Sequence, residues 1–345
     1  MSNTETEPVE HECAPAGCAE SMEILTPREV PLGGPRAMTV RRTLPQRRRS
    51  LIGPWCFVDH FGPDDVAETG GMAVPRHPHT GLATVTLLFE GEVDHRDTSG
   101  FANTVRPGEV NLMIAGTGIA HSEFSSTGTT HLRGVQLWYA LPDARRRSEP
   151  GSQHHVPELV ELPGGTVRTY LDALGGVTSP VETRVGALAA EVTVTAGTGL
   201  DVELDPTYEH GLLVDTGEVT IVADGHRRSV APHELAFLPV GPGTIRLEAG
   251  DEPVRAILVG GEPFGEQIVM WWNFVGRTHE EIVGFREAWQ AEIGAEPSAA
   301  ADEARASGRY ADGTTYPQFG TFPAGQPDPL PAPALPHARI TPREQ

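Results

Sequence analysis

Short runs of Val, Thr, Leu, Ile and Phe recur along most of this chain, and Gly, Pro, Asp or Asn stands at the breaks between them. Each run is long enough for a strand and too short for an ordinary helix. Many short strands at such spacing are typical of β-sandwiches and β-barrels. We therefore expect an all-β fold, with strands at 83–89, 110–114, 134–139, 167–171, 188–194, 211–214, 219–222, 235–238, 244–247 and 256–259.

An internal repeat predicts the number of barrels. Gly91 and Gly217 each begin a Gly-Glu-Val sequence, and Pro107 and Pro232 follow them at nearly the same distance, each within a similar apolar run. Both copies are typical of a hairpin, a Pro turn and a further strand. A chain of 345 residues has the length of about two domains. We expect two tandem β-barrels of similar build, over residues 23–150 and 151–276.

One helix and the two ends of the chain lie outside these barrels. A docking helix is expected over 277–295, because Thr278 and Glu281 form a capping box ahead of an apolar stripe at helical spacing. Residues 1–22 are acidic and without periodicity, which predicts a disordered leader. Residues 296–345 are rich in Pro and predict an extended, disordered tail.

Composition excludes several classes of function. The chain has 47 acidic and 26 basic residues, for a net charge of -21. So negative a chain repels polyanions, and direct nucleic-acid binding is not expected. All the basic residues are Arg, which excludes chemistry that needs a catalytic Lys. No apolar run has the length of a membrane span and the first residues lack the basic start of a secretory signal, so we expect a cytoplasmic protein.

Two pairs of residues at alternate positions are candidates for chemistry. They are His77 with His79, and His121 with Glu123. Alternate residues on a strand point to the same face, so each pair can present two ligands to one interior. Together they would form a pocket of three imidazoles and one carboxylate, which suits Fe(II), Mn, Co, Ni, Cu or Zn. The alternative interpretation is an exposed His-x-His at a strand edge and a coincidental second pair.

The residues around these pairs resemble a known family. Segments 53–63, 77–91, 106–109 and 115–123 are similar to the pirin family, a branch of the cupin superfamily, and the last of them reads Ala-Gly-Thr-Gly-Ile-Ala-His-Ser-Glu. The resemblance implies a bicupin whose N-terminal barrel binds one divalent transition metal. The implied ligands are His77, His79, His121 and Glu123, and we expect Fe(II) as the metal.

The second barrel is expected to be structural. Transferring the spacings of the first barrel onto it brings no imidazole to a ligand position, which predicts one metal per chain. The four transferred positions are Glu203, Asp205, Arg246 and Glu248. Two further histidines in family-like segments, His60 and His95, are interpreted as hydrogen-bonded structural residues, with substrate contact as the alternative.

The resemblance also implies an activity. Several pirins are similar to quercetin 2,3-dioxygenase, so we expect a metal-dependent dioxygenase that opens the ring of a flavonol such as quercetin with O2. Glu123 would then be both ligand and catalytic base. Two alternatives stay open: a non-enzymatic, redox-sensing regulatory protein with a protein partner, and a pirin-type protein with another substrate. The chain is expected to be a monomer.

Overall fold

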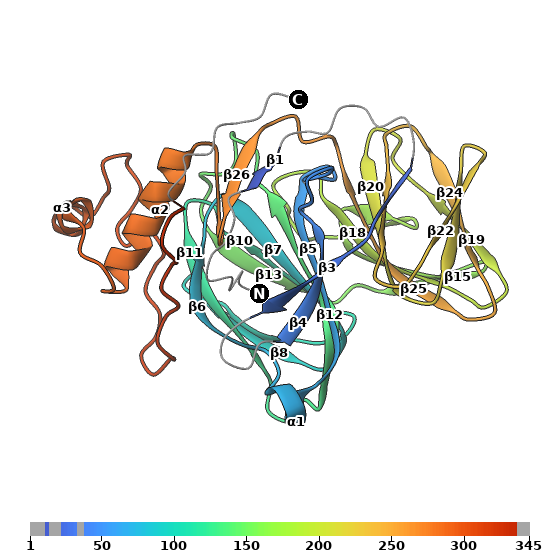
Figure 1. Cartoon of the computed structure of the whole chain (residues 1–345), viewed down its shortest axis with the longest axis horizontal. Helices are drawn as coiled ribbons and strands as arrows, with labels where there is room; N and C mark the ends of the chain where they lie inside the picture. The colour runs from blue at the N-terminus through green and yellow to red at the C-terminus, as the bar shows by residue number, and fades with distance from the viewer. Residues whose placement is uncertain (1–10, 14–21, 33–37, 337–345) are drawn as a thin grey trace.

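The computed structural model describes residues 11–13, 22–32 and 38–336, and two β-barrels stand side by side within them (Figure 1). Each barrel combines a seven-stranded sheet with a four-stranded sheet. The predicted all-β fold of two tandem barrels followed by a short helix is confirmed. No helix of the described residues has the length and apolar character needed to cross a membrane.

The first barrel contains the strands on which the candidate ligands lie. Its large sheet has the order β13 (Gly151–His155), β10 (Val110–Ile114), β7 (Leu82–Glu90), β12 (His131–Ala140), β5 (Trp55–Asp65), β4 (Met38–Leu44) and β3 (Arg28–Leu32). Its small sheet has the order β6 (Ala73–His79), β11 (Ile119–Ser125), β8 (Val93–Asp97) and β9 (Ala102–Val105). A short helix, α1 (Val66–Thr69), follows β5.

The second barrel repeats this arrangement. Its large sheet has the order β14 (Leu159–Leu162), β15 (Gly165–Leu171), β18 (Leu188–Val194), β25 (Val254–Gly261), β20 (Glu209–Thr216), β23 (Leu235–Leu238) and β2 (Glu23–Leu25). Its small sheet has the order β19 (Gly199–Glu203), β24 (Thr244–Ala249), β21 (Val219–Ala223) and β22 (His226–Val230). A two-stranded ribbon joins β16 (Ala173–Leu174) to β17 (Val177–Thr178).

The barrels exchange strands at their borders, which changes the boundaries expected from the sequence. Strand β2 pairs with β23 of the second barrel, although 23–150 was assigned to the first. Strand β13 pairs with β10 of the first barrel, although 151–276 was assigned to the second. Pairing follows backbone hydrogen bonds between distant segments, and the apolar pattern of a short strand does not specify its partner.

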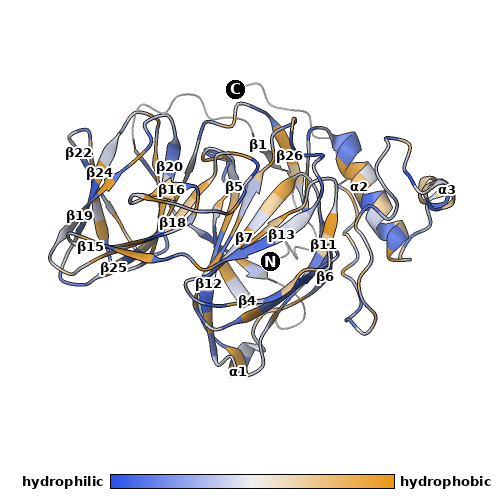
Figure 2. Cartoon of the chain, turned by 180° about the vertical axis from the view of Figure 1, so that it is seen from behind, coloured by the Kyte–Doolittle hydropathy of each residue, from blue (hydrophilic) through white to orange (hydrophobic). Residues whose placement is uncertain are grey.

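The large sheets of the two barrels pack against each other. Alternate residues of β7, including Val85 and Leu87, belong to one buried cluster with Leu213, Phe237 and Ile257 of the second barrel. Figure 2 shows hydrophobic residues along the strands of both barrels. Because residues of a strand alternate between faces, the other residues of β7, such as Thr86, point into the interior of the first barrel.

The docking helix forms as expected and packs against the first barrel. Helix α2 (His279–Glu292) begins after Thr278, whose side chain accepts a hydrogen bond from the Glu281 amide. Its residues Ile282 and Trp289 are buried in a cluster with Trp271 and Phe274. These two aromatic residues come from β26 (Ile268–Trp271) and β27 (Phe274–Gly276), which form a small sheet with β1 (His11–Cys13).

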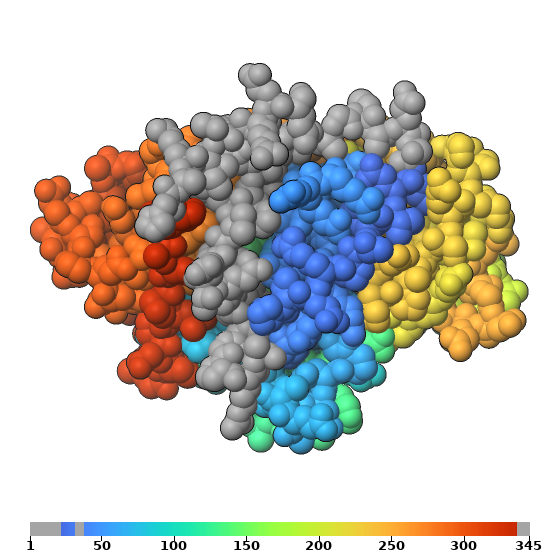
Figure 3. Space-filling model, viewed as in Figure 1, coloured from blue at the N-terminus to red at the C-terminus, as the bar shows by residue number. Residues whose placement is uncertain are grey.

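The Pro-rich segment is not the unpacked tail that its composition predicts. It contains α3 (Ala299–Ser307), and beyond this helix Phe319 is fully buried against the Trp289 ring of α2. The Trp289 Nε1–H group donates to the Leu330 carbonyl at 2.8 Å. Figure 3 shows this orange and red segment along one side of the molecule. Aromatic anchors thus override the Pro content.

Part of this prediction lies outside the described residues. They leave out 337–345 of the tail and all of the leader except 11–13 and residue 22. Residues 11–13 of the leader form β1 and pair with β26, which differs from the expected disorder.

Candidate metal centre

Two neighbouring strands of the small sheet bring the candidate histidines together. Strand β6 lies at the edge of that sheet and pairs with β11, with His77 opposite His121. The pairing shifts register between His121 and Glu123, opposite the segment that contains Pro75. Proline lacks an amide hydrogen, so it is tolerated on an edge strand and at an irregularity of this kind.

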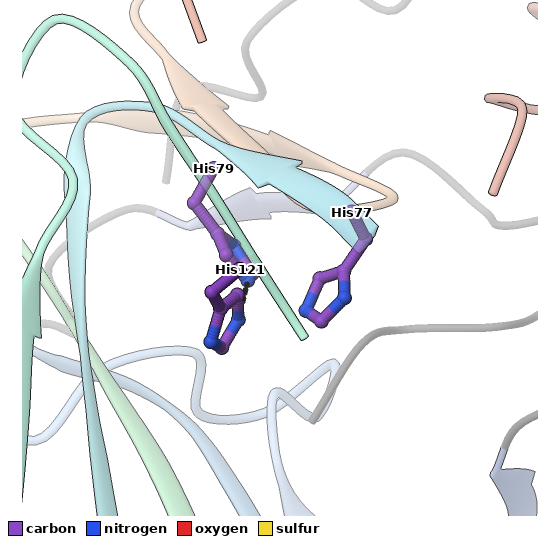
Figure 4. Close-up of side chains that lie close together, drawn as sticks. All are labelled: His77, His79 and His121. Atoms are coloured by element: carbon purple, nitrogen blue, oxygen red, sulfur yellow. Dashed lines mark hydrogen bonds between the residues drawn. The ribbon is translucent and has the colours of Figure 1, made fainter. Parts of the chain in front are cut away.

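The three imidazoles lie close together and are fully buried. One nitrogen from each ring of His77, His79 and His121 lies within 4.8 Å of the other two. The Nε2 atoms of His79 and His121 are 3.1 Å apart, and Figure 4 shows the His77 ring beside them. Each of the three residues is 0 % exposed. The predicted three-histidine cluster is therefore present as a geometric arrangement.

Hydrogen bonds to the opposite ring nitrogens specify which nitrogen of each ring is free. His77 Nδ1 lies 2.9 Å from the Pro75 carbonyl oxygen, and His79 Nδ1 lies 3.1 Å from that of Asn273. A carbonyl oxygen only accepts, so both Nδ1 atoms carry a proton and donate it. In the neutral rings, both Nε2 atoms then hold lone pairs.

A chain of hydrogen bonds through His95 and Asp97 specifies the tautomer of His121. His95 Nε2 lies 3.2 Å from an Asp97 carboxylate oxygen, and His95 Nδ1 lies 3.3 Å from His121 Nδ1. The carboxylate accepts from His95 Nε2–H, which leaves His95 Nδ1 as the acceptor for His121 Nδ1–H. The Nε2 atom of His121 therefore also carries a lone pair.

Three converging lone pairs in a buried site fit a cation. His77 Nε2 is buried and has no hydrogen-bond partner within the described part of the chain. A 3.1 Å separation of the His79 and His121 Nε2 atoms is also the spacing of two neighbouring ligands whose bonds to a metal are about 2.1 Å long. Buried polar atoms are rarely left unpaired, and a metal ion would satisfy all three nitrogens.

Burial also keeps the rings in the form that binds metal. It lowers the pKa of His77, His79 and His121 well below the ordinary imidazole value, and the neighbouring rings lower it further. The direction is the one expected when a group is taken out of water, because desolvation penalises the charged form. The three rings are thus neutral near pH 7, as metal ligation requires.

Glu123 lies beside this cluster rather than within it. Its carboxylate forms a second group with His121 and His95, whose ligand atoms also lie within 4.8 Å of one another. Glu123 is 1 % exposed, and Thr86 Oγ1 lies 3.3 Å from its Oε1 atom. The structure therefore brings the predicted carboxylate next to one of the three histidines.

His95 and Asp97 are the residues of this centre that sequence reasoning did not assign to it. They alternate on β8, opposite Glu123 and His121 respectively, so they face the same interior as the ligands. Ser99 and Ser152 donate to the Asp97 carboxylate and hold it in place. The signal in the sequence was a third alternating polar pair, His-x-Asp, with the spacing of the other two. The hydrogen-bonded role expected for His95 matches these contacts.

The other expected structural histidine lies elsewhere. His60 Nε2 lies 2.8 Å from Asp215 Oδ1 of the second barrel, and Arg133 and Arg255 bind the same carboxylate. This buried network joins the two barrels and does not touch the three-histidine cluster. Burial, the largest influence, lowers the pKa of His60 and outweighs the opposing effect of Asp215.

The second barrel carries no such group of ligands among the described residues. The four positions transferred by spacing were the wrong counterparts of the ligands, because their side chains do not face the interior of the second barrel. Arg246, for example, is exposed and pairs with Asp201, whereas its neighbours Ile245 and Leu247 are buried. The strand pairing makes Ile245 and Leu247 the equivalents of His121 and Glu123. The transferred spacing was wrong at both ends: compared with the first barrel, the second is one residue shorter between Pro232 and Leu247 and one residue longer between Val202 and Gly217.

Comparison with known proteins agrees with this architecture. The model of the Pirin family matches residues 37–139, and that of the Pirin C-terminal cupin domain matches residues 189–293. A Pseudomonas aeruginosa protein named "Putative quercetin 2,3-dioxygenase" is 40% identical over 271 residues, which cover 78% of this chain and 84% of the relative. Pirin of Rattus norvegicus is 31% identical over 275 residues, covering 74% and 91%.

A solved structure extends the likeness to three dimensions. The crystal structure of quercetin 2,3-dioxygenase from Acinetobacter baumannii superposes with a TM-score of 0.79 at 30% identity and covers 93% of this chain and 98% of its own. Both family models, the relatives and this superposition agree with the two-barrel arrangement and with the expected resemblance. The chain belongs to the pirin family of bicupins.

Proposed function

We propose that this protein is a metal-dependent dioxygenase that opens the ring of a flavonol such as quercetin with O2. The observation that carries the proposal is the convergence of three unprotonated Nε2 atoms in the first barrel, beside the Glu123 carboxylate. The quercetin dioxygenase named among its relatives supports the choice of substrate. The fold alone would not, because one fold can carry many activities.

His77, His79 and His121 would hold the metal, with Glu123 as the fourth ligand. Fe(II) is the metal that we propose, and Mn, Co, Ni, Cu and Zn suit the same ligands. When bound, a divalent metal supplies a Lewis acid that makes a coordinated hydroxyl group more acidic. One metal per chain is proposed, all of it in the first barrel.

Glu123 has a further role in this proposal as the catalytic base. A ligating carboxylate keeps a lone pair beside the substrate, so it can accept the proton of the substrate hydroxyl. The hydroxyl oxygen keeps the electron pair of the broken O–H bond, and the proton stays on the Glu123 carboxyl. Thr86 Oγ1 lies 3.3 Å from Glu123 Oε1 and 2.9 Å from Gln136 Oε1, so its single hydroxyl hydrogen is shared between these two acceptors.

Oxygen uptake with quercetin tests the proposal. The metal-loaded protein should consume O2, and His121→Ala should abolish the uptake together with most of the bound metal. Glu123→Gln keeps the shape and a weak oxygen ligand but removes the basicity. It should retain part of the metal and lose activity by about 10²-fold or more, the usual scale for a general base.

The exposed Glu90→Gln variant on β7 is the matched control and should behave as wild type. Full activity of metal-loaded Glu123→Gln would contradict the base role of Glu123. Absence of oxygen uptake by the metal-loaded wild-type protein would contradict the dioxygenase proposal itself.

One observation favours a second candidate, a non-enzymatic metal-dependent regulatory protein that acts on a protein partner. All three histidines are 0 % exposed and Glu123 is 1 % exposed, so a metal bound at this site would be held away from solvent. In that case the wild-type protein would bind metal without consuming O2, and Glu123→Gln would change metal affinity alone. The oxygen-uptake experiment separates the two candidates.

A further inference from the structure

A row of five buried polar side chains crosses the large sheet of the first barrel. Each residue is the direct cross-strand partner of the next, and each is at most 3 % exposed. The row consists of Asn111 on β10, Thr86 on β7, Gln136 on β12, Asp59 on β5 and Arg42 on β4. Thr86 contacts Glu123 of the opposite sheet, so the row faces the interior that holds the metal centre.

Two residues of this row, Arg42 and Asp59, form an ion pair with each other. Arg42 donates to both carboxylate oxygens of Asp59, from Nε at 2.8 Å and from Nη2 at 2.9 Å. Such a two-point contact between a guanidinium and a carboxylate is strong and specific in geometry. The burial of the two charges is therefore explained by this ion pair and does not require a ligand.

The other half leaves hydrogen-bonding groups open beside Glu123. Thr86 Oγ1 donates to Gln136 Oε1 at 2.9 Å, so the oxygen of that amide already accepts a hydrogen bond. The amide nitrogen of Gln136 and the Asn111 Oδ1 atom are buried and have no partner among the described residues. One is a donor and the other an acceptor, and leaving either unpaired in a protein interior is unfavourable.

The fold itself does not require polar residues here. In the second barrel the equivalent cross-strand row contains apolar residues next to one another, and these belong to its hydrophobic core. The residues that match Asn111, Thr86, Gln136 and Asp59 by strand pairing are Ala236, Leu212, Leu258 and Ala190. These four positions can thus be filled without hydrogen-bonding groups in the same architecture, and only the counterpart of Arg42, the buried Thr169, is polar.

We infer that Gln136 and Asn111 form the substrate-binding surface of the first barrel, an inference that rests on the proposed function. The Gln136 amide would donate to a carbonyl or ether oxygen of the substrate, and Asn111 Oδ1 would accept from a hydroxyl. The ligand class is a planar molecule with oxygen functions beyond the hydroxyl that Glu123 deprotonates. A site built to pair such groups discriminates strongly against analogues that lack them.

Binding of quercetin to the metal-loaded protein, followed by fluorescence titration, tests this inference. Gln136→Leu and Asn111→Ala introduce the residues of the second barrel, and each should weaken binding about 10-fold or more with metal content unchanged. Leu258→Met, a volume-conserving change at the matched position of the second barrel, should leave the affinity unchanged. Wild-type affinity in both row variants would overturn the inference.

Thermal unfolding in the absence of ligand provides a second readout. Gln136→Leu removes the unpaired amide nitrogen, and Thr86 Oγ1, which loses Gln136 Oε1 as an acceptor, still has Glu123 Oε1 at 3.3 Å. If the amide nitrogen is open until substrate binds, the melting temperature should therefore not fall. A melting temperature lowered by several degrees would show a structural role and overturn the inference. Failure of the loaded wild-type protein to bind quercetin, with an unlowered melting temperature in Gln136→Leu, would instead overturn the flavonol proposal.

Discussion

The two barrels have the same sheets in the same order and differ in what fills them. At six matched positions of the small sheet the first barrel carries His77, His79, His95, Asp97, His121 and Glu123. At those positions the second barrel carries Val202, Leu204, Ile221, Ala223, Ile245 and Leu247, all within one hydrophobic core. Every group of the candidate metal centre thus has an apolar counterpart.

This difference separates what the fold needs from what a site needs. Burying an aliphatic side chain stabilises a protein by about 1.5–3 kcal/mol, whereas burying a polar group is favourable only when that group finds partners. The second barrel shows that apolar residues fill this architecture well. The buried polar residues on the small sheet of the first barrel are therefore best explained by a ligand, and the lone pairs that their hydrogen bonds leave on the three imidazoles fit a cation.

The largest effect is expected from removing one of the three ligands. His79→Ala should weaken metal binding by at least about 10³-fold, because it removes a whole coordinate bond and no neighbouring group can replace it. Competition with a chromogenic chelator measures the change. His131→Ala, an exposed histidine on β12, is the matched control and should bind as wild type. Near-normal affinity in His79→Ala would refute the ligand assignment.

Introducing a ligand residue into the second barrel should damage it. Leu247 is the counterpart of Glu123 and is 1 % exposed, so Leu247→Glu buries a carboxylate without a partner. We expect a loss of about 3–5 kcal/mol in the free energy of unfolding, measured in urea. Arg246→Gln, at the exposed neighbouring position, should change stability by less than about 0.5 kcal/mol. A tolerated Leu247→Glu would indicate that the second interior is more polar than described.

The hydrogen-bond chain behind His121 gives a smaller effect. His95→Leu removes the acceptor for His121 Nδ1–H, so the ring loses its preferred tautomer and orientation. Metal affinity should fall about 10–100-fold, as for other outer-shell partners of a ligating histidine. His95→Gln keeps an acceptor oxygen and should recover part of the affinity. Equal affinities for both variants would show that His95 does not act through His121.

Acid should destabilise the metal-free protein through both barrels, and most strongly through the first. Burial lowers the pKa of His77, His79 and His121, and lowers that of His210 in the second barrel to about 4. Below pH 6.5, about the ordinary pKa of an imidazole, these histidines are protonated in the unfolded chain but stay neutral in the folded protein. The free energy of unfolding therefore falls as the pH falls.

The size of this pH effect can be divided between the barrels. Each such histidine contributes about 1.4 kcal/mol per pH unit within that window, between the unfolded and the folded pKa. His210→Gln should therefore reduce the slope by the contribution of a single group and leave the larger part in place. Urea unfolding of the chelated protein between pH 7 and pH 5 measures it. A flat profile in wild type would contradict the neutral, buried state of the rings.

The sequence was sufficient to predict the barrels and the three histidines, because both depend on local patterns. Alternation placed His77 with His79 and His121 with Glu123, and the repeat indicated two barrels. Contacts between distant segments could not be predicted from the sequence. Asp97 and Gln136 became visible only through cross-strand pairing, and Phe319 packs on Trp289 although its segment is rich in Pro.

Metal analysis of the protein purified without chelator or added metal tests the central claim most directly. The first barrel offers three converging Nε2 atoms, and no group of ligands was found in the described part of the second. We therefore predict one transition-metal ion per chain by mass spectrometry, and almost none in His79→Ala. A stoichiometry near two, or one ion per chain that His79→Ala retains, would contradict the account.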